Sequence, residues 1–154
     1  MTVHVHIPGA DDLSLEHLVL DVNGTLTDRG EPIISALRVI ECLRDRLELH
    51  VLSADTFGTA EALAASIRAE YRPVDSGQDK LEYIATLGAQ QCVAIGNGRN
   101  DGPMLYAAGL GIAVIGPEGL HVEALTAADV IALSIDEALE LLADARILTA
   151  TLRP

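Results

Sequence analysis

The stretch from Asp21 to Thr27, DVNGTLT, follows the short apolar run HLVL at residues 17–20. A continuous apolar run of this kind is typical of a strand that is covered on both faces of a sheet. An acid at the end of such a strand, followed by a Gly-Thr turn, puts a carboxylate at the edge where parallel sheets bind ligands. The stretch therefore predicts a candidate site built around Asp21.

Further apolar runs along the chain resemble the first, and segments with helical spacing separate them. We expect strands at residues 17–22, 48–54, 91–97, 111–116 and 129–134. We expect helices at residues 33–46, 58–70, 78–87, 101–108, 119–127 and 136–145. This alternation predicts an α/β fold, a Rossmann-like three-layer sandwich with a mostly parallel central sheet. Near the N-terminus, VHVHIPG and LSLEHL predict an additional antiparallel strand.

Length and charge narrow the class of protein. With 154 residues, of which 49% are hydrophobic, residues 1–154 are expected to form a single domain with its own core. The formal net charge of −13 argues against nucleic acid or an anionic membrane as a partner. No apolar run is long enough to span a membrane, and the first residues lack the features of a signal peptide. We therefore expect a cytoplasmic protein.

The cysteines and histidines lack the spacing of metal sites along the chain. Cys42 and Cys92 are expected to be buried thiols rather than a disulfide. His4 and His6 would share one face of the N-terminal strand, and we interpret them as solvated edge residues rather than a metal pair. The same interpretation holds for the remaining histidines, which are His17, His50 and His121.

Four short motifs fall at or just after expected strand ends or helix starts. They are Asp21, Ser53 in VLSAD, Lys80 in SGQDKLEY, and Asp101 at the end of GNGRND. Because the carboxyl ends of parallel strands meet at one edge of a sheet, these side chains could share one cleft. Taken singly, each has a plain structural interpretation as a turn, strand-end, helix-start or helix-cap residue. Their order and spacing together favour a functional site.

These motifs resemble those of the haloacid dehalogenase-like phosphatase and phosphotransferase superfamily. The resemblance is closest to the catalytic domain of P-type ATPases and to small proteins that look like that domain alone. DVNGTLT resembles the ATPase pattern DKTGTLT, SAD resembles TGD, and GNGRNDGPML resembles GDGxNDxPAL. The motifs span residues 21–105, and their order and spacing match throughout.

The resemblance implies catalytic roles for two residues. Asp21 would attack a phosphoryl group and form an aspartyl-phosphate, which splits a difficult displacement into two steps. Lys80 would act as a cation on both the nucleophile and the transferring group. Backbone N–H groups of the Gly-Thr turn would face the phosphate. The residues implied in phosphate binding are Ser53, Gly24, Thr25 and Asn100.

The resemblance also implies Mg²⁺ as the cofactor and a small phosphorylated molecule as the substrate. Mg²⁺ is a hard ion that takes oxygen ligands and keeps several waters. The implied ligands are Asp21, the main-chain carbonyl of Asn23, Asn97 and Asp101.

Two positions depart from the phosphatase pattern. Asn23 stands where most members have a general acid/base Asp, and Asn97 stands where the first Asp of the GD motif usually binds metal. P-type ATPases share the first departure and remain active. Losing a general acid/base typically costs about 10² to 10⁴-fold in rate, so we expect slow turnover or a long-lived phosphoenzyme. The less negative site should hold a phosphate dianion better and bare Mg²⁺ less well.

Two functions stay open at this point. One is a slow Mg²⁺-dependent phosphohydrolase, and the other is a non-catalytic phosphate- or nucleotide-binding or regulatory module. The intact Asp21 and Lys80 favour the enzyme, because a pure binder has no need of a nucleophile. The segments on either side of Ser53 are too short to hold a cap domain. An uncovered cleft suggests a large substrate or a homo-oligomer.

Overall fold

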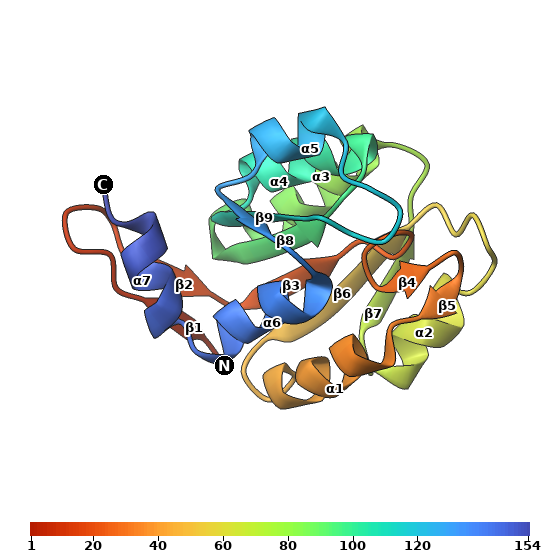
Figure 1. Ribbon diagram of the computed structural model, residues 1–154, viewed down its shortest axis with the longest axis horizontal. Coiled ribbons are helices and arrows are strands. Elements are labelled where there is room, and N and C mark those ends of the chain that lie inside the picture. Colours follow the sequence, from red (N-terminus) through yellow and green to blue (C-terminus); the bar gives the residue numbers. More distant parts are fainter.

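A six-stranded sheet forms the centre of the computed structural model, which describes all 154 residues (Figure 1). The strand order is β10-β9-β8-β3-β6-β7, and every neighbouring pair is parallel. The strands are β3 (His17–Leu20), β6 (Glu48–Ser53), β7 (Glu70–Pro73), β8 (Cys92–Gly96), β9 (Leu110–Val114) and β10 (Val130–Ala132). Every residue of β8 and β9 is buried, as the continuous apolar runs predicted.

Helices cover both faces of the sheet and complete three layers (Figure 1). One face carries α1 (Ile34–Leu43), α2 (Ala60–Ser66) and α6 (Ile135–Ala143), which share one apolar cluster with the sheet. The other face carries α3 (Gly77–Leu87), α4 (Gly102–Ala107) and α5 (Val122–Ala127), which pack in a second apolar cluster. The predicted Rossmann-like three-layer sandwich is confirmed.

Two small hairpins lie at opposite ends of the central sheet (Figure 1). At the amino end of β3, β1 (Val3–Val5) pairs antiparallel with β2 (Leu13–Leu15), beside α7 (Arg146–Leu152). This confirms the expected N-terminal antiparallel strand. At the carboxyl end, β4 (Thr27–Asp28) pairs with β5 (Glu31–Pro32) just after the DVNGTLT turn.

Some elements were not expected from the sequence. Strand β7 reads EYRP, and three of its four residues are exposed, so it lacks the apolar run of a buried strand. A proline in an edge strand is tolerated because no neighbour needs its missing N–H. The β4–β5 pair and α7 were also missed, since both are short.

The two cysteines are free thiols in different surroundings. Cys92 is buried, as expected, whereas Cys42 is exposed on α1, which corrects the expectation that both would be buried. None of the helices has the length and apolar character needed to cross a membrane.

Candidate active site

Asp21 lies directly after β3, at the carboxyl edge of the sheet. Its N–H still donates to the carbonyl of Ile95 on β8 at 3.0 Å, so the neighbouring strand fixes its position. The chain then turns sharply, because the carbonyl of Val22 accepts the N–H groups of Thr25, Leu26 and Thr27 at 2.9–3.1 Å. Only 6% of Asp21 is exposed, so the turn holds a nearly buried carboxylate.

Gly24 is required by this turn for two reasons. Its φ of +76° lies in the left-handed region that side chains rarely adopt. A Cβ atom there would also lie 2.5 Å from Nδ2 of Asn97. The glycine thus brings the DVNGTLT turn against the GNGRND loop.

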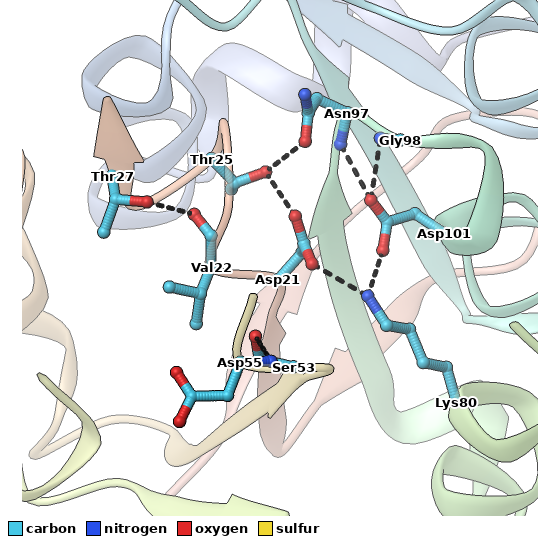
Figure 2. Close-up of polar contacts among 10 residues, drawn as sticks. All are labelled: Asp21, Val22, Thr25, Thr27, Ser53, Asp55, Lys80, Asn97, Gly98 and Asp101. Carbon is cyan, nitrogen blue, oxygen red and sulfur yellow. Dashed lines mark hydrogen bonds and ion pairs between the residues drawn. The ribbon is translucent and has the colours of Figure 1, made fainter. Parts of the chain in front are cut away.

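Lys80, the only lysine of the chain, is completely buried. Its Nζ lies between the carboxylates of Asp21 and Asp101 (Figure 2). Helix α3 begins with a capping box, in which Ser76 and Asp79 each bind the other's backbone N–H. This fixed start places Lys80 in the first turn of α3. Its Nζ donates to Oδ1 of Asp21 at 2.8 Å and to Oδ1 of Asp101 at 2.6 Å.

The charges of this cluster shift the pKa values of its members. Burial alone would lower the pKa of Lys80, but the carboxylates of Asp21 and Asp101 outweigh it and raise that pKa. Burial raises the pKa of Asp101 to about 6, and the charge of Asp21 adds to this effect while Lys80 opposes it. Lys80 is therefore a fixed positive charge between two acids at neutral pH.

Asp101 is held by the backbone of its own loop. Its Oδ2 accepts the N–H groups of Asn97 at 3.0 Å and Gly98 at 2.8 Å (Figure 2). The Asp101 side chain packs against Gly96, where a Cβ atom would collide with its carboxyl group. The first glycine of GNGRND is thus needed to make room for the carboxylate.

Thr25 and Asn97 form a second set of contacts next to Asp21. The Thr25 hydroxyl oxygen lies 3.1 Å from both Oδ2 of Asp21 and Oδ1 of Asn97, and its single proton can be donated to only one of them at a time. Nδ2 of Asn97 donates to the carbonyl of Gly119 at 3.0 Å. The Asn97 amide therefore joins the site to the loop that follows β9.

Three predicted site residues have other surroundings. Ser53 is buried at the end of β6, and its hydroxyl accepts the N–H of Asp55 at 2.9 Å, which leaves its own proton free to donate. Asn23 is half-buried in the turn. Asn100 is exposed and lines an open hollow of about 550 Å³, together with Gly77 and four other residues that do not include Asp21.

The backbone N–H groups of the Gly-Thr turn are not arranged as the sequence predicted. The N–H of Gly24 donates to Thr27, and that of Thr25 donates to Val22, so both are satisfied inside the turn rather than directed at an open face. The hydroxyl group of Thr25, rather than its N–H, contacts Asp21. A role for Gly24, Thr25 and Asn100 in phosphate binding stays a prediction.

Solved structures with the same architecture are known. The cobalt-bound deoxy-D-mannose-octulosonate 8-phosphate phosphatase of Haemophilus influenzae superposes with a TM-score of 0.70 and 17% identity, over 91% of this chain and 94% of that chain. A hydrolase of the haloacid dehalogenase (HAD) family from Streptomyces avermitilis superposes with a TM-score of 0.68 and 22% identity, over 90% and 87%. The chain therefore has the fold of these phosphatases and haloacid dehalogenase-family hydrolases.

A third structural neighbour was solved with ligands. It is the 3-deoxy-D-manno-octulosonate 8-phosphate phosphatase of Moraxella catarrhalis, in complex with magnesium, phosphate and its sugar acid. The TM-score is 0.69 at 17% identity, over 88% of this chain and 90% of that chain. At these identities the likeness establishes the fold.

The chain is also similar in sequence to a larger transporter and to an uncharacterized protein. The chain is 40% identical over 114 residues to a probable cation-transporting ATPase G of Mycobacterium tuberculosis. This match covers 70% of the chain but only 14% of the transporter. The chain is also 42% identical over 64 residues to an uncharacterized protein of Methanocaldococcus jannaschii, covering 42% of the chain and 69% of that protein. No family model matches the chain.

Proposed function

We propose that this chain is a metal-dependent phosphohydrolase that acts on a small phosphorylated substrate through an aspartyl-phosphate at Asp21. One observation carries the proposal: a nearly buried carboxylate at a strand end is paired with a buried lysine, Lys80, that also binds Asp101. The haloacid dehalogenase-like fold and the phosphatases among its structural neighbours support it.

The covalent step needs a carboxylate held in place for attack. Nζ of Lys80 donates to Oδ1 of Asp21 at 2.8 Å, and Thr25 contacts Oδ2, so both oxygens of the carboxylate are oriented. An oxygen of Asp21 then forms a bond to phosphorus, and the bond from phosphorus to the leaving oxygen breaks. Water afterwards attacks the phosphorus, which releases inorganic phosphate and returns the Asp21 carboxylate.

The remaining side chains stabilise the transferring group. Lys80 offsets the negative charge that gathers on the phosphoryl oxygens in the transition state. The free hydroxyl proton of Ser53 can be donated to one of these oxygens. Thr25 steadies the unbonded oxygen of Asp21.

The residues around Asp21 fit a magnesium ion. Asp21 and Asp101 both present carboxylate oxygens toward Lys80, and the amide oxygen of Asn97 and main-chain carbonyl of Asn23 belong to the adjoining loops. This set of oxygen donors suits a hard divalent ion. When bound, Mg²⁺ would neutralise charge on the phosphoryl group. Because Asn97 is neutral, we expect Mg²⁺ to bind more weakly than in a site with three acids.

The segment between the Asp21 turn and β6 is short and holds only β4, β5 and α1. We propose that residues 1–154 therefore act as a single domain without a cap. A homo-oligomer in which a neighbour covers the cleft stays a prediction. The two free thiols suit a reducing, cytoplasmic setting.

Hydrolysis of p-nitrophenyl phosphate tests the proposal and its alternative. We expect slow release of phosphate that requires added Mg²⁺ and stops when the ion is chelated. A chain that binds phosphate by calorimetry, yet turns over none of a panel of aryl phosphates and phosphorylated metabolites with Mg²⁺ present, would instead be a phosphate-binding module.

Replacing Asn23 with Asp should increase kcat about 100-fold on an alkyl phosphate, because it restores an acid/base beside Asp21. The gain should be small on p-nitrophenyl phosphate, whose leaving group needs little protonation. Steady-state kinetics on both substrates measure this difference. Gln91→Glu, an exposed change just before β8 at the opposite edge of the sheet, adds the same charge without an acid in the turn and should leave kcat unchanged.

A further control concerns the chemistry of Asn-Gly pairs. Asn23 precedes Gly24, and such pairs deamidate, so mass spectrometry must establish that the parent carries Asn. If Asn23→Asp is no faster than the parent on the alkyl phosphate at saturating Mg²⁺, the missing acid does not limit turnover.

A further inference from the structure

A cluster of imidazole and carboxylate groups lies at the amino end of the sheet, away from the Asp21 site. Strands β3 and β6 are parallel neighbours, with His17 paired to Glu48 and Val19 paired to His50. Paired residues, and residues two apart on a strand, point to the same face. The register therefore places His17, Glu48 and His50 together, although 33 residues separate the two histidines along the chain.

The three side chains converge on one point. Nδ1 of His17 lies 3.1 Å from Nε2 of His50 and 3.4 Å from Oε2 of Glu48. All three ligand atoms lie within 4.8 Å of one another. A tetrahedral zinc ion with bonds of about 2.0–2.1 Å needs ligand atoms about 3.3 Å apart, and both distances from His17 are close to this value.

His50 is held in the orientation that metal binding needs. Its Nδ1 lies 3.0 Å from the hydroxyl of Tyr83 on α3, and only 3% of the residue is exposed. With the Nδ1 proton donated to Tyr83, Nε2 keeps its lone pair and faces His17. A second ring N–H that binds a fixed acceptor is the usual arrangement of histidine ligands.

The cluster is also accessible. The side chain of Glu48 is 61% exposed and that of His17 is 14% exposed. Glu48 and His50 both line an open hollow of about 320 Å³, together with Glu70. An ion could enter from this side, and the fourth position could hold water.

We propose that His17, Glu48 and His50 form a second metal site, for a divalent transition ion of the zinc class. Two imidazoles and one carboxylate favour zinc over Mg²⁺, which prefers oxygen ligands. Binding requires His17 to carry its proton on Nε2, so that both facing nitrogens offer lone pairs. His17 lies four residues before Asp21, roughly 13 Å along β3, so this site is separate from the candidate active site. The ion would link β3 to β6, whose other ends carry Asp21 and Ser53.

Cobalt(II) titration of untagged, metal-free protein tests this site. Excess Mg²⁺ should be present to occupy the oxygen ligands around Asp21. We expect one cobalt ion per chain with the intense visible bands of tetrahedral coordination, and zinc should displace it. His17→Gln should weaken cobalt binding at least about 100-fold, and Tyr83→Phe about 10-fold. Glu48→Gln should weaken it at least about 10-fold.

His4→Gln is the matched control, because His4 is an exposed histidine that bonds only to Ser14. It should bind cobalt like the parent. Circular dichroism without metal establishes that each variant folds. If a change at His17 or Tyr83 disturbs folding, Glu48→Gln carries the test, because that side chain is 61% exposed. Absence of tetrahedral bands in the parent, or bands that persist unchanged in His17→Gln and Glu48→Gln, would overturn the proposal. Because Asp21 takes no part, either outcome leaves the proposed hydrolase activity to its own test.

Discussion

Asp21→Asn should remove phosphohydrolase activity, with kcat falling at least about 1,000-fold, because the neutral amide cannot form the bond to phosphorus. Asn has nearly the shape of Asp and can still accept a hydrogen bond from Lys80 through its amide oxygen. Lys80 keeps its ion pair with Asp101, so the fold should persist. Phosphate release under saturating Mg²⁺ measures the loss.

Asp75→Asn provides the matched control for this change. Asp75 is exposed before α3, and the substitution removes the same charge without touching Lys80. It should retain the activity of the parent. If the Asp21→Asn variant, freshly prepared and free of deamidated protein, still turns over at a rate comparable to the parent, Asp21 is not the nucleophile.

Lys80→Met should lower the free energy of unfolding by about 3–5 kcal/mol in the absence of metal. Methionine fills similar space, but it leaves Asp21 and Asp101 facing each other at the point where Nζ now bonds to both. Burying two unpaired carboxylates costs far more than losing one lysine side chain. Urea unfolding followed by circular dichroism measures the difference, and activity should be lost as well.

A double-mutant cycle with Asp101→Asn separates the charge effect from packing. Asp101→Asn combined with Lys80→Met removes one of the two stranded carboxylates, so the double variant should lose less stability than the two single losses added together. A Lys80→Met protein within 1 kcal/mol of the parent would mean that the ion pairs contribute little, contrary to the arrangement seen around Lys80.

Most of the sheet could be predicted from the sequence, because its buried strands are continuous apolar runs. All five expected strands are present, with ends that differ from the expected ones by at most two residues, and the site residues Asp21, Lys80 and Asp101 do meet. Strand-end placement in a parallel sheet predicts that Asp21 meets the loop of Asp101, whereas Lys80 reaches both from the first turn of α3. The Ser76–Asp79 capping box, which positions Lys80, is also visible in the sequence as a Ser followed three residues later by an acid.

Other features could not be predicted from local pattern. Strand β7 is polar and pairs only at the sheet edge, so neither periodicity nor burial marks it. The internal bonding of the Gly24 and Thr25 N–H groups depends on the three-dimensional turn. His17 and His50 have no ligand spacing along the chain, and only the β3–β6 register brings them together.

Acid quenching during turnover, followed by mass spectrometry of the peptide that contains Asp21, tests the central claim most directly. With Asn23 in place of an acid, the intermediate should persist, so we expect a substantial fraction of the chain to carry one phosphoryl group on Asp21 in the steady state. The adduct should be absent from Asp21→Asn, disappear when Mg²⁺ is chelated before substrate is added, and decay faster in Asn23→Asp. Turnover by the parent with no adduct at any quench time, or with the phosphoryl group on another residue, would contradict the account.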